Sequence, residues 1–168
     1  MASSSSRNIT PTKRLLTELQ AYQSDPNEAL LELGPINDDE LMQWRAVMKG
    51  VEGTAYEGGQ WELLISIPSS YPMVPPTIRF ATPICHPNVD FRTGEICLDV
   101  LKDRWTPAMQ ISSSLTYVHQ LLTSAEPDSP LNVDIAQLFR AEDYVGAEAL
   151  IRFYTETERW GGVRRETR

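Results

Sequence analysis

Residues 86–105 contain the side chains of this chain whose types and spacing suit covalent chemistry. Cys97 stands between two aliphatic residues, nine positions after Asn88. Gly94 favours a turn between them because glycine accepts a positive φ, and Asp90 favours one through local hydrogen bonds. A chain that folds back here places a carboxamide beside a thiol. Such a pair suits acyl transfer, in which a thiolate attacks a carbonyl and an amide N–H stabilises the oxyanion by roughly 3 kcal/mol.

The same residues also have a purely structural interpretation. A single cysteine between Ile96 and Leu98 is in most proteins a small buried hydrophobe. Asn88 in a His-Pro-Asn sequence is also a common turn former. The residues by themselves leave both interpretations open, and Cys85, beside His86, is expected to be a packing residue.

Alternating hydrophobicity predicts the strands that must position this segment. Residues 44–48, 61–67 and 77–81 show the period of two that is typical of half-buried strands, and a shorter strand over 30–33 is expected before Gly34-Pro35 breaks the chain. An antiparallel meander is the simplest topology. Residues 69–76, with three prolines, are expected to form a stiff loop. The positions expected to face the core are Trp44, Ala46, Met48, Trp61, Leu63, Ile65, Ile67, Ile78 and Phe80.

Helical periodicity flanks these strands. A first helix is expected to be capped by Thr10, with Pro11 at its first position, and to end at residues 24–26. A central helix follows Pro107, and two more are expected over 134–140 and 143–160, with Asp143 capping the last. The expected apolar positions are Leu15, Leu16, Leu19 and Tyr22, then Ile111, Leu115, Val118 and Leu122, then Val145, Ala149, Leu150 and Phe153. The predicted class is α+β.

Length and composition set the remaining limits. The chain has 168 residues, which fits one domain over residues 10–160, between a disordered tail at 1–9 and a short tail at 161–168. A net charge of −8 argues against nucleic-acid binding, which requires a basic surface. Two cysteines indicate a reducing compartment. No stretch approaches the ~20 apolar residues that span a bilayer. We therefore expect a cytoplasmic protein.

A series of short motifs adds a resemblance to a known family. YPMVPP begins at Tyr71, HPN at His86, GEICL at Gly94, WTPA at Trp105 and DSPL at Asp128. In this order and spacing they resemble the catalytic core of ubiquitin-conjugating enzymes, over residues 10–160. The resemblance implies the UBC fold: a four-stranded antiparallel meander with an N-terminal helix, a central helix and two C-terminal helices.

The resemblance also implies roles for the residues around the thiol. Cys97 is expected to carry ubiquitin as a thioester, and Asn88 to support the transition state or its loop. A position in the family's nearby loop is often an aspartate that positions or deprotonates the attacking lysine; here it is Ser129, preceded by Asp128. A serine hydroxyl can orient an amine but is a poor base at neutral pH. The residues expected to be structural near the site are His86, Pro87, Leu98 and Trp105.

The implied partners are ubiquitin, the ubiquitin-activating enzyme and a RING-type ligase. Lys13 and Arg14 of the first helix are expected to dock the activating enzyme. The ligase is expected to bind a surface formed by Met73, Thr106, Pro107 and Ala108. No metal site is expected, because a single histidine such as His119 lacks further ligands at suitable spacing. No cofactor is expected either, since the activating enzyme uses the ATP.

Residues 67–73 and 128–135 resemble the peroxisomal member of the family, the peroxin that ubiquitinates the import receptor for recycling. This subtype implies a membrane-anchored peroxin that holds the enzyme on the cytosolic face of the peroxisome, with Tyr144 as its docking residue. The insertion of one residue at Phe91-Arg92 distinguishes the chain from the shortest family members.

Four alternatives stay open at this point. The chain could be a general cytosolic ubiquitin-conjugating enzyme, an enzyme for another ubiquitin-like modifier, or a catalytically silent ubiquitin-binding module. It could also be a cysteine hydrolase with His86 or His119 as the base, although the protease signatures around the cysteine are absent.

Overall fold

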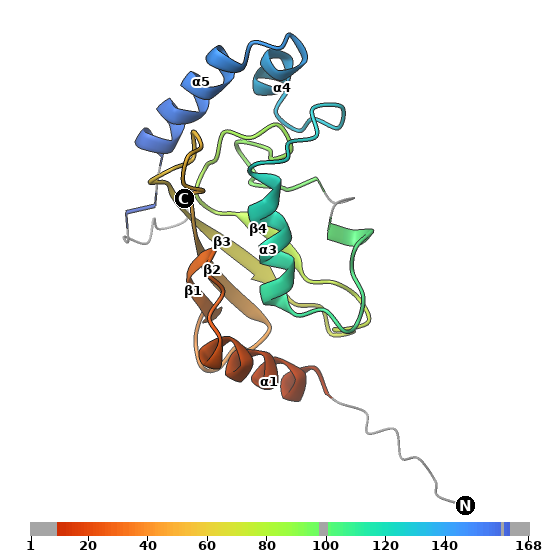
Figure 1. Cartoon of the computed structure of the whole chain (residues 1–168). Helices are drawn as coiled ribbons and strands as arrows, with labels where there is room; N and C mark the ends of the chain where they lie inside the picture. Colours follow the sequence, from red (N-terminus) through yellow and green to blue (C-terminus); the bar gives the residue numbers. More distant parts are fainter. Residues whose placement is uncertain (1–9, 98–100, 159, 162–168) are drawn as a thin grey trace, which may run out of the picture.

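The computed structural model describes residues 10–97, 101–158 and 160–161 (Figure 1). The predicted tail at 1–9, the predicted tail at 161–168 except for its first residue, and Leu98 beside the thiol lie outside these residues. The described part is an α+β fold, as predicted, with a sheet and four helices of eight residues or more.

The sheet is a four-stranded antiparallel meander. Its strands are β1 (Leu30–Pro35), β2 (Gln43–Lys49), β3 (Gln60–Ser66) and β4 (Thr77–Phe80), in the order β1-β2-β3-β4. Trp44 pairs with Ile65, and Leu63 pairs with Phe80. Because side chains alternate between the two faces of a sheet, this register directs the predicted core residues to one side, and each of the nine is at most 5% exposed.

The central helix α3 (Ile111–Leu121) covers this apolar face of the sheet (Figure 1). Its predicted positions Ile111, Leu115 and Val118 are buried, together with Leu122 just beyond its end. The side-chain amide of Asn27 fastens the helix to the turn before β1 through the Ser112 carbonyl, 3.1 Å away. This packing fixes the chain on both sides of the segment that contains Cys97.

The first helix, α1 (Pro11–Ser24), begins and ends where the sequence predicts. The Thr10 hydroxyl accepts a hydrogen bond from the Lys13 amide at 3.3 Å, and Pro11 occupies the first helical position. One predicted core position is wrong: Leu16 is 45% exposed, whereas Glu18 is 4% exposed. The helix is rotated toward Glu18 because this carboxylate receives hydrogen bonds from distant segments.

The two C-terminal helices, α4 (Val133–Arg140) and α5 (Tyr144–Thr157), pack together at the end of the molecule opposite α1 (Figure 1). Asp143 caps α5, as predicted, through the Gly146 amide at 2.9 Å. The predicted end at residue 160 is wrong, because the chain leaves the helix and the Trp160 amide donates to the Gln60 carbonyl at 2.7 Å.

The predicted apolar side of α5 is mostly wrong, although Leu150 is partly buried against the core. Val145 is 83% exposed and Phe153 57% exposed, whereas the buried positions are Ala147, Ile151 and Thr155. Apolar residues occur on two sides of this helix, so their spacing alone does not determine which side meets the core. The consequence is an apolar surface on α5 that is open to solvent.

Candidate active site

A tight turn brings the backbones of Cys97 and Asn88 together at the turn that the sequence predicts. The Cys97 amide donates to the Asn88 carbonyl at 2.9 Å, and Val89 forms an isolated β-bridge with Ile96. The turn between them is closed by the Asp90 carboxylate, which accepts hydrogen bonds from the Arg92 and Thr93 amides at 2.9 and 2.8 Å. These amides, Thr93 foremost, lower the pKa of Asp90, so the carboxylate stays ionised and keeps the turn closed.

Gly94 connects this turn to the free edge of β4. Its φ is +74°, and a Cβ atom built on it would lie 1.7 Å from the Phe80 carbonyl oxygen. The Phe80 amide donates to the Gly94 carbonyl at 2.9 Å, and Arg79 forms a bridge with Glu95. Only glycine allows this conformation and this approach together. The segment that ends at Cys97 is therefore held directly by the sheet.

The two cysteines have different environments. Cys97 is partly exposed, whereas Cys85 is 3% exposed. Burial is the main reason that the pKa of the Cys85 thiol rises to about 12. Because the thiolate is the nucleophile, Cys85 is unreactive near neutral pH. Cys97 is the thiol that another protein can reach.

His86 is a structural residue rather than a base. Its side chain is fully buried, with Nε2 2.7 Å from the Leu121 carbonyl and Nδ1 accepting from the Asn88 amide at 3.0 Å. An amide N–H at Nδ1 requires the neutral tautomer protonated at Nε2. Desolvation lowers the pKa of His86 to about 4, which keeps the ring neutral.

The geometry gives the cysteine hydrolase alternative no base. His86 uses both ring nitrogens on the backbone, and His119 on α3 has its Nε2 3.1 Å from the Lys49 carbonyl. Within the residues that the structure describes, neither histidine is hydrogen-bonded to Cys97. A catalytic Cys–His pair requires such contact.

Asn88 holds the loop of residues 126–132 against the turn. Its side-chain N–H groups donate to the carbonyls of Glu126 at 2.7 Å and Ser129 at 3.1 Å, while its oxygen accepts from the Glu126 amide at 2.8 Å. The neighbouring Pro87 carbonyl accepts from the Leu131 amide at 2.8 Å. Glu126 was missed in the sequence because it contributes backbone atoms, which every residue type provides.

Comparison with known proteins now decides the family. The sequence pattern of the ubiquitin-conjugating enzymes matches residues 14–154. This chain belongs to the ubiquitin-conjugating enzyme family. The predicted family, fold and enzyme class are thereby confirmed.

Similar proteins include peroxisomal family members. The ubiquitin-conjugating enzyme E2 PEX4 of Gibberella zeae is 45% identical over 148 residues, which are 86% of this chain and 86% of that protein. Protein PEROXIN-4 of Arabidopsis thaliana is 42% identical over 146 residues, 84% of this chain and 90% of that protein. The predicted resemblance to the peroxisomal subtype is confirmed.

A similar solved structure is the H. polymorpha ubiquitin-conjugating enzyme Pex4p in complex with the soluble domain of Pex22p. It has a TM-score of 0.82 at 33% identity, and the match covers 88% of this chain and 97% of that one. In the present chain, no helix among the described residues is both long and apolar enough to cross a membrane.

The loop that Asn88 holds contains Asp128 and Ser129, the residues predicted to act on the attacking lysine. Asp128 and Ser129 are both exposed. The Ser129 backbone is fixed on both sides, since its amide donates to the Glu126 carbonyl at 3.2 Å and its carbonyl accepts from Asn88. Their roles toward an incoming amine stay predictions.

The structure brings the predicted ligase-binding residues onto two adjacent loops. Met73 is 72% exposed, and Thr106, Pro107 and Ala108 are exposed as well. Trp105 joins the two loops: its indole N–H donates to the Pro72 carbonyl at 2.9 Å, and its ring lies 5.6 Å from that of Tyr71. Trp105 therefore has a clear structural part in this surface.

The other predicted partner-binding residues differ in how available they are. Lys13 is exposed on α1. The Arg14 guanidinium, in contrast, contacts Glu18 and donates to the carbonyls of Pro107 at 3.0 Å and Met109 at 2.7 Å. Tyr144, at the start of α5, is 54% exposed.

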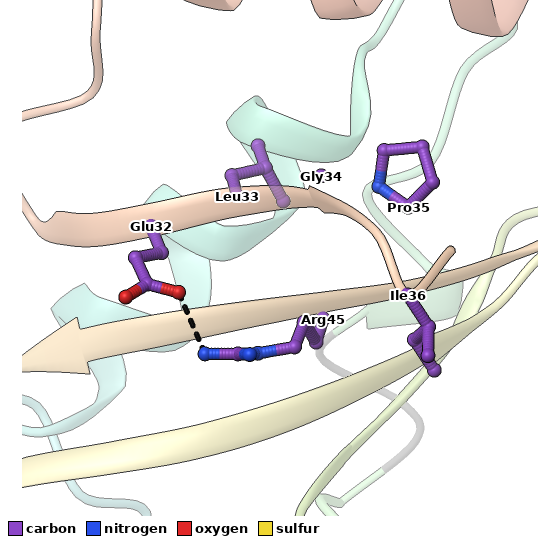
Figure 2. Close-up of a pocket in the computed structure, with 6 residues that line it drawn as sticks. All are labelled: Glu32, Leu33, Gly34, Pro35, Ile36 and Arg45. Carbon is purple, nitrogen blue, oxygen red and sulfur yellow. Dashed lines mark hydrogen bonds and ion pairs between the residues drawn. The ribbon is translucent and has the colours of Figure 1, made fainter. Parts of the chain in front are cut away.

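A surface pocket on β1 and β2 lies apart from the thiol and offers no chemistry of its own (Figure 2). Its one cationic group, Arg45, is paired with Glu32 at 2.6 Å and with Glu62 at 3.4 Å, and it lies over the ring of Trp160. The lining residues are Glu32, Leu33, Gly34, Pro35, Ile36 and Arg45. Among the described residues, no group of histidine, cysteine, aspartate and glutamate side chains could hold a metal ion.

Proposed function

We propose that this enzyme accepts ubiquitin as a thioester on Cys97 and, with a RING-type ligase, transfers it to a substrate, the peroxisomal import receptor. The observation that carries the proposal is the partly exposed Cys97 thiol at the end of a turn fixed to β4, in a chain of this family. ATP enters through the activating enzyme, so this chain needs no nucleotide site.

The first step exchanges one thioester for another. The Cys97 thiolate attacks the C-terminal carbonyl carbon of ubiquitin, a new C–S bond forms, and the thiolate of the activating enzyme leaves. Because one thioester replaces another, the step is nearly neutral in energy. The buried neutral His86 takes no proton in it, which agrees with its structural hydrogen bonds.

The second step consumes the thioester. A substrate nucleophile attacks the same carbonyl, its proton is lost to solvent or a nearby group, and the Cys97 thiolate leaves. We expect Ser129, whose backbone carbonyl is held by Asn88, to orient the nucleophile. The Asn88 hydrogen bonds support a role in holding this loop; direct stabilisation of the oxyanion requires Asn88 to release the Glu126 or Ser129 carbonyl.

The test mixes the protein with activating enzyme, ATP and ubiquitin and separates the products on a non-reducing gel. We expect an adduct that thiols remove, that is absent in Cys97→Ala and that becomes a thiol-resistant ester in Cys97→Ser. Cys85→Ser is the matched control and should load normally. An adduct that survives in Cys97→Ala refutes the proposal, and absence of any adduct favours a catalytically silent binding module. Loading with another modifier in place of ubiquitin would identify that alternative.

We further propose that a membrane-anchored peroxin binds α5 and holds the enzyme at the cytosolic face of the peroxisome. Two observations support this: a relative was crystallised with the soluble domain of Pex22p, and α5 exposes the apolar side chains of Tyr144, Val145 and Phe153. Exposed apolar patches are typical of binding surfaces. Tyr144→Ala should weaken binding of such a partner, whereas Gln20→Ala on α1 should not. Unchanged affinity in Tyr144→Ala would remove this docking site.

A further inference from the structure

Glu18 is a buried carboxylate that the reaction itself does not use. It lies on α1, is 4% exposed, and accepts hydrogen bonds from three residues, two of them in distant segments. Arg14 Nε donates to Oε1 at 2.8 Å, the Ile111 amide donates to Oε2 at 2.8 Å, and the Tyr71 hydroxyl also donates to Oε1. A buried charge persists only when it is paired and hydrogen-bonded, and here three donors meet that requirement.

Two of these donors, Tyr71 and Ile111, come from segments that flank the predicted ligase surface. Tyr71 lies two residues before Met73 in the proline-rich loop, and Ile111 begins α3 three residues after Ala108. The Gln110 side chain makes no capping hydrogen bond, so Glu18 satisfies an amide at the N-terminus of α3 from another helix. Carboxylates favour this position because of the helix dipole.

Arg14 extends the same network to the second loop. Its two terminal nitrogens donate to the Pro107 and Met109 carbonyls, and its guanidinium lies 5.9 Å from the centre of the Tyr71 ring. Burial and the neighbouring carboxylate raise the pKa of Tyr71, so its hydroxyl stays protonated and continues to donate. Backbone hydrogen bonds within each loop join only near neighbours, such as Met73 to Ser70 and Met109 to Thr106, so the Arg14 side chain adds contacts from outside the loop.

We propose that Glu18 is a positioning residue for the ligase: with Arg14 and Tyr71 it fixes the Met73 loop and residues 106–108 relative to each other. The proposal rests on the function proposed above. The Arg14 guanidinium then holds the ligase-binding loops through its hydrogen bonds to the Pro107 and Met109 carbonyls. Lys13 is the exposed cation that remains on α1 to bind the activating enzyme.

The test separates ligase binding from chemistry. Glu18→Gln keeps the side-chain size but turns an amide N–H toward one of the three donors. After loading with ubiquitin, discharge to free lysine is measured with increasing amounts of a RING domain that stimulates the wild type. We expect the RING concentration for half-maximal discharge to rise about tenfold, the usual scale for losing a hydrogen bond to a charged group. Discharge without the ligase should stay within about twofold, since a group that acts only through ligase binding leaves the chemical step unchanged.

Tyr71→Phe is the second variant, because it removes only the hydroxyl that donates to Glu18. It tests the positioning role of Glu18 if Glu18→Gln does not fold. It should shift the half-maximal RING concentration in the same direction, and the backbone amide resonances of Met73, Thr106 and Ala108 should move. Gln20→Ala, exposed on the same helix, should match the wild type in both measurements. Folded variants with wild-type ligase response and unmoved resonances overturn the inference. A wild type that fails to load refutes the proposed function instead, and the resonances still report on the loops.

Discussion

Acidification from pH 7 to pH 5 should destabilise this protein through His86. In the folded chain the buried ring has a pKa of about 4, whereas an unfolded chain returns it to its ordinary value of 6.5. At a pH between these two values His86 is mostly protonated in the unfolded state and mostly neutral in the folded state. The contribution of His86 to the free energy of unfolding is therefore largest above pH 6.5, and it falls as the pH drops toward 4.

The magnitude follows from the two pKa values. Their difference of about 2.5 corresponds to about 3.4 kcal/mol once the pH lies below both. At pH 5 the folded ring is still mostly neutral and the unfolded ring mostly charged, which gives a loss of about 2 kcal/mol relative to pH 7. A domain stabilised by about 5–15 kcal/mol loses a considerable fraction of its stability this way.

Urea denaturation at pH 7, 6 and 5 measures this loss. His86→Gln should be less stable at pH 7, because the bonds to Leu121 and Asn88 change. Its further loss on acidification should be smaller than that of the wild type by about 2 kcal/mol. His119→Gln is the control, since His119 is only half-buried and should carry less of the pH dependence. Equal pH dependence in His86→Gln and the wild type would refute the argument.

Three further predictions follow from the packing. Gly94→Ala should destabilise the fold by more than about 2 kcal/mol and impair loading, because it adds a backbone clash to the penalty for positive φ; Gly53→Ala, with the same φ of +74° and nothing within 4 Å of its Cβ, should cost only about 1 kcal/mol in thermal denaturation. In urea denaturation, Ile151→Ala should lower the free energy of unfolding by about 3 kcal/mol and Val145→Ala by less than about 0.5 kcal/mol. Similar losses in the two variants would contradict the burial of Ile151 and the exposure of Val145. Iodoacetamide at pH 8 should alkylate Cys97 at least about 100 times faster than the buried cysteine, measured by peptide mass spectrometry, and equal rates would contradict the assigned burial.

Local signals in the sequence were sufficient for the sheet, α3 and the turn before Cys97. Two kinds of feature depend only on neighbours in the chain, and the sequence therefore predicts them well. They are the alternation of the strands around Trp44 and Trp61 and the helix caps at Thr10 and Asp143. Gly94 likewise marks its turn by type alone.

The sequence-based predictions are wrong where contacts with residues distant in the sequence determine which side chains are buried. Hydrophobicity predicts Leu16 in the core, whereas the structure buries Glu18, because the donors that stabilise its carboxylate include residues 71 and 111, which are distant in the sequence. In the same way, the sequence marks Asn88 as a candidate but not its backbone partners at Glu126 and Ser129. Periodicity reports that a helix has an apolar side, and it cannot select between two such sides, as α5 illustrates.

The contact between Gly94 and Phe80 involves main-chain atoms on both sides. The backbone that leads to Cys97 is therefore held against the sheet by peptide groups, which are the same whatever side chains surround them. The side chains of Arg92, Thr93 and Glu95 are exposed, so other side chains at these positions would leave the contact between the turn and the sheet unchanged. A single glycine thus separates the part of this surface that must stay constant from the part that is available for new recognition.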